Sequence, residues 1–162
     1  MMKKNLFKYL LILSLTGLVS CTSTKQVTST AVWGQHEIEC LGIDFDGTQQ
    51  LKVYSKGANR SDAIEKALKM AVHAVTFESI TGGDCNARPI IVEANAERKY
   101  EDYFHIFFAT GGEYRKYVQL AKNSNAGTIK GKGDGLTLYV IHVNVDRASL
   151  RKRFESDHII VK

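Results

Sequence analysis

The clearest alternation of apolar and polar positions lies near the C-terminus, in residues 136–145. Alternate positions would place four apolar side chains on one face of an extended chain, namely Tyr139, Ile141, Val143 and Val145. Leu138 and Val140 would lie on the opposite face, so both faces carry apolar side chains. Because strands that are apolar on both faces are typical of the interior of a sheet, the pattern predicts a central strand over 136–145.

Two more strands are predicted in the N-terminal half of the chain, over 36–43 and 49–56. Asp46-Gly47 lies between them, and this dipeptide is typical of a tight turn because glycine adopts positive φ without steric cost. The two strands should therefore form an antiparallel hairpin.

The longest helix is predicted over 61–79, with Ser61 as its N-cap. Apolar residues spaced three and four apart make one stripe on this helix, consisting of Ile64, Leu68, Ala71, Val72 and Val75. A neighbouring row is made of alanines, namely Ala63, Ala67, Ala71 and Ala74. Because alanine has a short side chain, this helix should pack closely on a sheet.

A second helix is predicted over 95–108, where five aromatic side chains share one face: Tyr100, Tyr103, Phe104, Phe107 and Phe108. Aromatic residues at helical spacing more often belong to a core than to a ligand platform. A short strand is predicted before this helix, over 90–92. Another is predicted after it, over 114–121, with Val118 and Leu120 facing inward.

The last helix is predicted over 147–157, with Asp146 as its N-cap. Leu150 and Phe154 lie four positions apart on its inner face, and Ile159 should pack after its end. Strands and helices thus follow one another without the strict alternation of a parallel α/β fold. The order predicts an α+β fold, with a largely antiparallel sheet of about four strands and helices packed on one face.

Residues 1–20 have the three parts of an export signal. Three lysines precede an apolar stretch over 9–19, and a small-residue cleavage site follows. Residues 18–21, Leu-Val-Ser-Cys, resemble the bacterial lipobox, whose cysteine alone can form the diacylglycerol thioether. We therefore expect residues 1–20 to be a lipoprotein signal peptide and Cys21 to be lipidated. The alternative is an ordinary secretory signal that happens to be followed by a cysteine.

The segment after Cys21 is rich in threonine and serine and should form a lipidated tether over 21–32. A single α+β domain is expected over 33–162. The formal net charge of +5 loses its significance once the signal is removed, because 19 of the 22 basic residues then remain against 17 acidic ones. Near balance gives no reason to expect a nucleic-acid partner.

Two further cysteines, Cys40 and Cys85, would belong to the exported domain, where disulfides persist. A bond between them would span 45 positions (85 − 40), which corresponds to about 4 kcal/mol of stabilisation in the chain-entropy account. The alternative is two separate buried thiols, since a free cysteine behaves as a small apolar residue. No second cysteine or histidine lies at metal-ligand spacing from either one.

The predicted elements share a pattern with a known family. Gly57 at the end of a strand precedes the alanine row of the long helix, and later a valine-rich strand enters Asp146 with Leu150 and Phe154 behind it. Over roughly residues 49–157 this resembles the N-terminal domain of the flagellar assembly protein FlgT and small Gram-negative envelope lipoproteins of that fold. The resemblance implies an envelope assembly or interaction module that is not an enzyme.

No pattern in the sequence predicts a catalytic, cofactor or metal site. The glycine-rich segment 127–133 differs from a phosphate-binding loop in its spacing and lacks the Ser or Thr after the lysine. Residues 44–47 begin like a calcium loop but have no downstream acidic ligand. The five histidines fall in different predicted elements: His36, His73, His105, His142 and His158. An enzyme would need such side chains to converge in a cleft.

The expected function is therefore that of a non-catalytic lipoprotein of the outer membrane, facing the periplasm. It would bind the membrane through acyl chains on Cys21 and bind or position another envelope protein. Thr22, rather than aspartate, after the cysteine fits outer-membrane sorting. The alternative is a small-ligand or glycan-binding lipoprotein that uses Tyr100, Tyr103 or the 122–135 loop.

Overall fold

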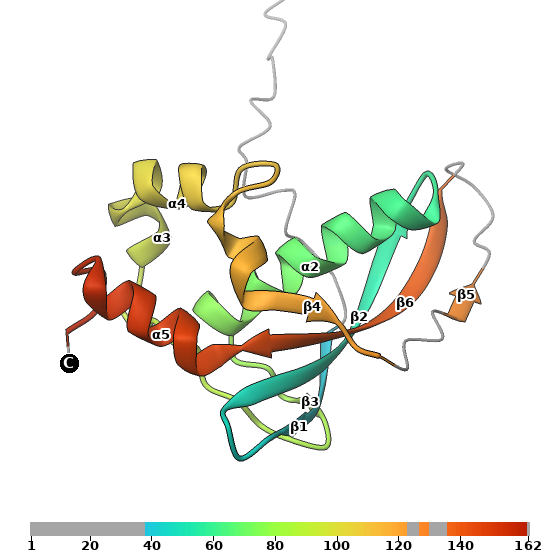
Figure 1. The fold of residues 1–162 in the computed structure, drawn as a ribbon, viewed down its shortest axis with the longest axis horizontal. Helices are drawn as coiled ribbons and strands as arrows, with labels where there is room; N and C mark the ends of the chain where they lie inside the picture. The colour runs from blue at the N-terminus through green and yellow to red at the C-terminus, as the bar shows by residue number, and fades with distance from the viewer. Residues whose placement is uncertain (1–37, 123–126, 130–135, 162) are drawn as a thin grey trace, which may run out of the picture. The chain divides into compact units, whose positions relative to one another are not determined.

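A computed structural model of the chain describes residues 38–122, 127–129 and 136–161 (Figure 1). The predicted signal peptide, Cys21 and the tether lie outside the described residues. So does most of the 122–135 connection, including both lysines of its glycine-rich segment, Lys130 and Lys132.

The sheet is largely antiparallel, as predicted. Its strands are β1 (Ile38–Ile43), β2 (Thr48–Gly57), β3 (Gly82–Gly83), β4 (Val118–Leu120), β5 (Gly127–Ile129) and β6 (Thr137–Asp146). Their order is β3-β1-β2-β6-β4, and β5 also pairs with β6. The two-residue strand β3 is parallel to β1, and the other pairs are antiparallel.

Strand β6 has the central position that its apolar pattern predicts. It pairs with β2 along its whole length on one side and with β4 and β5 on the other. Ile141, Val143 and Val145 are completely buried on the face that the long helix covers. The hairpin between β1 and β2 is also confirmed, with one irregularity in register between Cys40 and Gly42.

Helix α2 (Arg60–Phe77) runs back along the sheet from the end of β2 and packs on β2, β6 and β4 (Figure 1). All four alanines of its predicted row are buried, which allows this close packing. The predicted N-cap, Ser61, is wrong. Asn59 caps the helix, because its side chain accepts a hydrogen bond of 2.9 Å from the backbone N–H of Asp62.

Three predicted elements are corrected by tertiary contacts. The first is the strand over 90–92, which is absent from the described structure. The backbone N–H groups of Ile90 and Ile91 instead donate to the carbonyl oxygens of Val75 and Thr76, at 3.0 and 2.9 Å. These carbonyl oxygens lie in the last turn of α2, where no helical N–H group is left to bond them. Residues 90–92 therefore bind the end of a helix rather than a neighbouring strand.

The second correction concerns the aromatic helix over 95–108, which bends into α3 (Ala96–Lys99) and α4 (Glu101–Phe107). Helical hydrogen bonding continues through Tyr100, but its φ of −115° and ψ of 36° turn the axis. Ala96 in α3 and Phe104 in α4 are both buried, so the bend brings both segments onto the core.

The third correction concerns 114–121, which is extended only in β4. Residues Glu113–Tyr117 form a 3-10 helix, and Tyr114 enters the core with its hydroxyl donating to Glu65 at 2.6 Å. Val118 is half-buried, but Leu120 is 40% exposed and does not face inward as predicted. Its strand lies at the edge of the sheet, where less of the side chain is covered.

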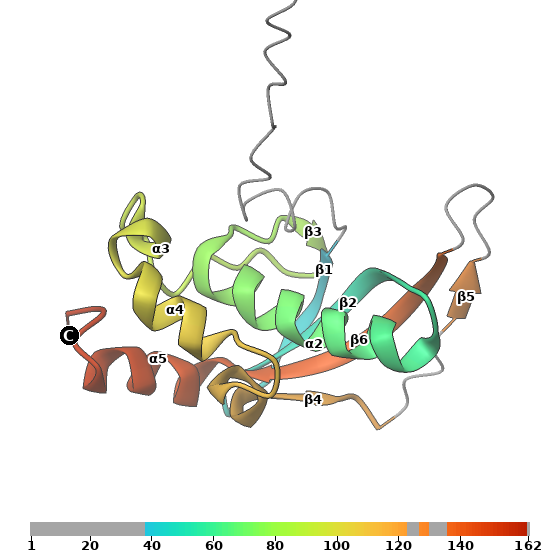
Figure 2. The ribbon, with the colours of Figure 1, turned by 90° about the horizontal axis from the view of Figure 1, so that it is seen from above.

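Helix α5 (Arg147–Ser156) follows β6 directly and confirms the prediction at the C-terminus. Asp146 caps it by accepting from the backbone N–H of Ser149 at 2.8 Å, and Leu150 and Phe154 are completely buried. Helices α3, α4 and α5 gather at one end of the sheet, beside the C-terminal end of β6 (Figures 1 and 2).

Candidate interaction surface

The turn between β1 and β2 is held tightly by its own backbone and side chains. Asp44 N–H donates to the carbonyl of Thr48 at 2.8 Å, and Gly47 N–H donates to the carbonyl of Asp44 at 2.9 Å. The side chain of Asp46 accepts from Thr48 N–H at 2.8 Å. Gly47 has a φ of 87°, which favours glycine at this position. The turn therefore has a defined conformation.

The same turn also rests on the rest of the domain. A Cβ at Gly47 would lie 3.1 Å from the Cβ of Ala148, so the turn lies against the start of α5. The Gln50 side chain donates to both carboxylate oxygens of Asp44 at 3.0 Å. These contacts limit the movement of the turn relative to the sheet.

Two apolar side chains project from this turn region into solvent. Phe45 is fully exposed at the tip, and Ile43 at the end of β1 is 48% exposed. Isolated exposed apolar residues are ordinary on protein surfaces. A fully exposed aromatic side chain on a fixed turn, two positions from a second exposed apolar residue, has instead the character of an interface contact. We call Ile43 and Phe45 the hairpin tip.

Carboxylates border the hairpin tip. Asp44 and Asp46 are both exposed on either side of Phe45. The hydrogen bond from the backbone N–H of Thr48 lowers the pKa of Asp46, so this carboxylate is ionised over a wide pH range. The tip is thus apolar at its centre and negative at its rim.

The sheet face opposite α2 carries half-buried Leu138 and Val140 together with polar side chains that contact one another. Lys52 Nζ lies 2.9 Å from Glu39 Oε2, and the Tyr54 hydroxyl donates to Glu39 Oε1 at 3.1 Å. Lys52 lowers the pKa of Glu39 through this hydrogen bond. His142 lies directly opposite Lys52 in the register of β2 and β6. Leu138 and Val140 are half-buried on this face, whereas Phe45 is fully exposed at the hairpin tip.

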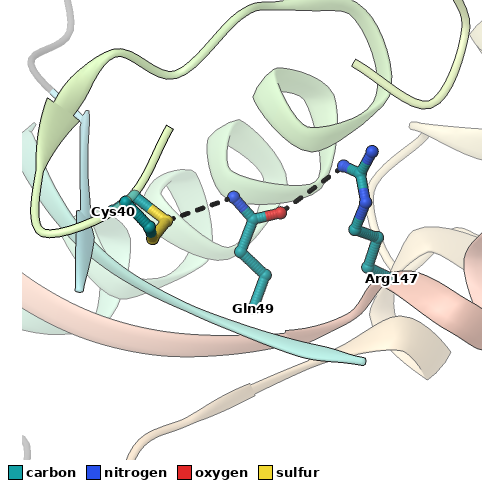
Figure 3. Close-up of a disulfide and its surroundings, with 4 residues drawn as sticks. Cys40, Gln49 and Arg147 are labelled. Carbon is teal, nitrogen blue, oxygen red and sulfur yellow. Dashed lines mark hydrogen bonds between the residues drawn. A yellow bond between two sulfur atoms is a disulfide. The ribbon is translucent and has the colours of Figure 1, made fainter. Parts of the chain in front are cut away.

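Behind the hairpin, Cys40 and Cys85 form the predicted disulfide, with Cα atoms 5.2 Å apart. Gln49 lies next to it and is completely buried (Figure 3). Its Nε2 donates to Cys40 Sγ, and its Oε1 accepts from Arg147 Nη1, both at 3.5 Å. Arg147 Nη2 also donates to the carbonyl of Arg88 at 2.7 Å. One polar chain therefore connects β1, β2, the Cys85 loop and α5.

Burial has an electrostatic consequence at Arg147. It lowers the pKa of the guanidinium, which nevertheless remains protonated because arginine titrates far above neutral pH. The carbonyl oxygens of Val75 and Arg88 and the amide oxygen of Gln49 accept its hydrogen bonds. The guanidinium of Arg147 therefore connects β2, α2 and the Cys85 loop, because its N–H groups donate to acceptors within the fold.

The two tyrosines singled out as ligand contacts are engaged within the fold. The Tyr103 hydroxyl donates to Asp157 Oδ2 at 2.6 Å, and its ring contacts Phe104 edge to face at 5.1 Å. Burial raises the pKa of Tyr103. Tyr100 packs against the core and has Lys99 Nζ 5.0 Å from its ring centroid. The aromatic face is therefore core, as its spacing predicts.

His73 was named from the sequence only as one of five scattered histidines, and its contacts with two carboxylates were not predicted. The side chain of His73 is only 6% exposed, and its two ring nitrogens lie 3.2 Å from Glu78 Oε1 and 3.1 Å from Glu97 Oε1. A histidine inside the continuous apolar run 70–75 of a helix is a signal that could have identified it. Its partners could not be identified in this way, because Glu97 lies 24 positions away.

Within the described part of the chain, no group of three or more His, Cys, Asp or Glu side chains is arranged to hold a metal ion. Asp44 and Asp46 bind Gln50 and Thr48 within the turn rather than forming a calcium loop. No helix within 38–122, 127–129 or 136–161 has the length and apolar character needed to cross a membrane.

Comparison with known proteins adds no relative: no family model, curated protein or solved structure matches this chain.

Proposed function

We propose that this protein is a non-catalytic lipoprotein of the outer membrane, facing the periplasm, which binds or positions another envelope protein through the hairpin tip. The observation that carries the interaction role is the full exposure of Phe45 on a turn fixed by hydrogen bonds. The likeness to FlgT-type envelope domains noted in the sequence agrees with such a role.

Rigid presentation supports the hairpin tip as a binding element. A side chain loses freedom when a complex forms, and a preorganised backbone reduces this cost. Phenylalanine is among the aromatic residues that are enriched at the cores of protein interfaces. A suitable partner would offer an apolar pocket for Phe45 with basic groups at its rim, facing Asp44 and Asp46.

The proposed location and anchoring of the protein are supported by separate observations. The lipobox-like segment 18–21 supports acylation of Cys21, and several acyl chains on one cysteine give stable membrane anchoring. The disulfide between Cys40 and Cys85 is in keeping with an oxidising compartment outside the cytoplasm. Thr22 supports sorting to the outer membrane.

A small-ligand or glycan-binding role has less support. It depended on Tyr100, Tyr103 or the 122–135 loop. The Tyr103 hydroxyl already donates to Asp157, and its ring contacts three other aromatic rings. A ligand would have to compete with these contacts.

The test uses the full-length protein in its native membrane, with a photo-crosslinking residue at position 48 beside the tip. We expect one envelope protein to crosslink in stoichiometric amount and be identified by mass spectrometry. Phe45→Ser should abolish this product, whereas Val92→Ser, which removes another exposed apolar side chain, should leave it unchanged. Equal crosslinking in both variants would remove the hairpin tip from the proposal.

The anchoring is tested separately with Cys21→Ala. This variant should lose its acyl chains, seen as a change in mass, and leave the membrane fraction. Membrane retention without acylation would contradict lipid anchoring, but it would leave the hairpin tip as a candidate contact.

A further inference from the structure

His73 lies where three elements meet. It lies near the C-terminal end of α2, Glu78 is the C-cap of that helix, and Glu97 lies in the first turn of α3. The ring also packs against Phe77 and Phe108, with centroids 5.0 and 5.6 Å away. A single side chain therefore joins the end of α2 to the α3–α4 segment.

The hydrogen-bonding geometry requires two protons on the ring. A carboxylate is only an acceptor, and each ring nitrogen of His73 lies within hydrogen-bonding distance of one carboxylate. A neutral imidazole has one N–H and would turn a lone pair toward the second carboxylate. Both contacts are favourable only when the ring is a cation.

The surroundings favour this cation. Burial of the ring lowers the pKa of His73, but the hydrogen bonds to Glu78 and Glu97 together outweigh burial and raise it above the ordinary value. Among the described residues, the charged groups that hydrogen-bond the ring are Glu78 at the end of α2 and Glu97 in α3, while Phe108, the C-cap of α4, packs its ring against it. The C-terminal end of α2 adds a negative partial charge.

Helix α3 depends on such a contact because its own ends are weak. It has four residues, and isolated helices of this length are unstable in water. Its N-cap, Asn95, is in the left-handed region with a φ of 65° and makes no side-chain capping bond. Burial of Ala96 and the ion pair between Lys99 and Glu93 at 2.7 Å hold α3 in addition to His73.

We propose that His73, Glu78 and Glu97 form a pH-sensitive clasp, which holds α3 against the end of α2 while His73 is protonated and releases α3 when it loses that proton. The clasp depends neither on the hairpin tip nor on the lipid anchor.

The direction of the pH effect follows from the two ionisations. The raised pKa of His73 means that its contribution is complete below about pH 6.5, the ordinary histidine value, and is lost as the pH rises through the folded pKa. The hydrogen bond from His73 lowers the pKa of Glu97, so the Glu97 contribution is lost only at acid pH. The clasp is closed between these limits.

The test combines histidine NMR with hydrogen exchange on the oxidised protein. The ring nitrogen shifts should show both nitrogens of His73 protonated below the ordinary histidine pKa and the ring titrating above that value. The amides of Lys99 and Tyr100, which hydrogen-bond within the α3 turn, should lose protection between about pH 6 and about pH 9, as His73 gives up its proton. The amide of Asp157 at the end of α5 is the internal reference.

Replacing the buried His73 could unfold the domain, so the clasp is altered from its exposed side. Glu97→Gln should lower the pKa of His73, because one of the two carboxylates that raise it is lost, and should reduce the protection of α3 already below neutral pH. Glu101→Gln, an exposed carboxylate in the first turn of α4, is the matched control and should change neither quantity. A wild-type His73 pKa at or below the ordinary histidine value, or α3 protection independent of pH, would overturn the proposal.

Discussion

The hairpin between β1 and β2 and the short helix α3 are both irregular parts of this fold, and different chemistry holds each in place. The hairpin has a disulfide behind it, backbone hydrogen bonds within its turn and α5 beneath Gly47. Helix α3 has an uncapped start and depends on a histidine between two carboxylates.

The difference shows how rigidity and responsiveness are distributed. A disulfide and amide hydrogen bonds do not titrate near neutral pH, so the hairpin keeps its conformation and can present Phe45 at little entropic cost. An imidazolium flanked by carboxylates does titrate in that range. The same domain can thus combine a fixed contact element with a segment whose attachment depends on pH.

The largest expected effect tests the covalent side of this comparison. Replacing both Cys40 and Cys85 by alanine should lower the free energy of unfolding by about 2–5 kcal/mol, since the unfolded chain loses its crosslink. Urea unfolding measures the change, and wild type under reducing conditions should match the double variant. A change below about 1 kcal/mol, well short of the usual effect, would mean that the hydrogen bonds alone fix the hairpin.

A smaller effect is expected at the start of α2, the helix that both regions contact. In Gly57→Ala the new Cβ would lie 2.6 Å from the backbone nitrogen of Ala63, so β2 and α2 must move apart. Overpacking of this kind costs about 1–3 kcal/mol in the free energy of unfolding.

Gly42→Ala is the matched control for this measurement, because no atom of the described residues lies within 4 Å of a Cβ there. Thermal unfolding of both variants, with the disulfide intact, gives the comparison. Equal loss of stability in the two would contradict the close approach of β2 and α2.

The contacts of His73 with Glu78 and Glu97 predict a smaller change in stability, which depends on pH. The free energy of unfolding should decrease as the pH rises from about 6.5 through the raised pKa of His73, because the folded protein holds this proton more tightly than the unfolded chain. Urea unfolding at several pH values measures the slope. Glu97→Gln should flatten it, and a slope unchanged by this substitution would assign the pH dependence to other groups.

The smallest effect on stability is expected at the hairpin tip. Phe45 is fully exposed, so Phe45→Ser should alter the free energy of unfolding by less than about 0.5 kcal/mol. Urea unfolding measures this, with Val92→Ser as a second exposed apolar site. A larger loss would show that Phe45 supports the fold and would weaken its assignment as a contact residue.

Elements with a strong local signal could be predicted from the sequence. Alternation over 136–145 identified the central strand, Asp46-Gly47 identified the turn, and Asp146 identified the start of α5. In each case the residues that decide the conformation lie within a few positions of one another. The disulfide was predicted from the number of cysteines and the expected compartment, while its alternative remained open until the Cα atoms were placed.

Elements whose conformation depends on distant contacts were predicted less well. Ile90 and Ile91 are β-branched and would suit a strand. Their backbone N–H groups instead donate hydrogen bonds to carbonyl oxygens at the C-terminal end of α2. Tyrosine is common in strands, so Tyr114 would suit one. It lies instead in a 3-10 helix, from which its hydroxyl donates a hydrogen bond to Glu65. Local propensity is weak compared with burial and hydrogen bonding of this kind.

The sequence by itself determined the positions of the main strands and helices, the turn that carries Phe45 and the row of alanines that lets α2 approach the sheet. Only the tertiary structure decided that Phe45 remains uncovered and that His73 meets Glu97, because exposure and ion pairing depend on which distant segments come together. Periodicity reports which face of an element is apolar. It does not report which neighbour, or whether any neighbour, will cover a given side chain.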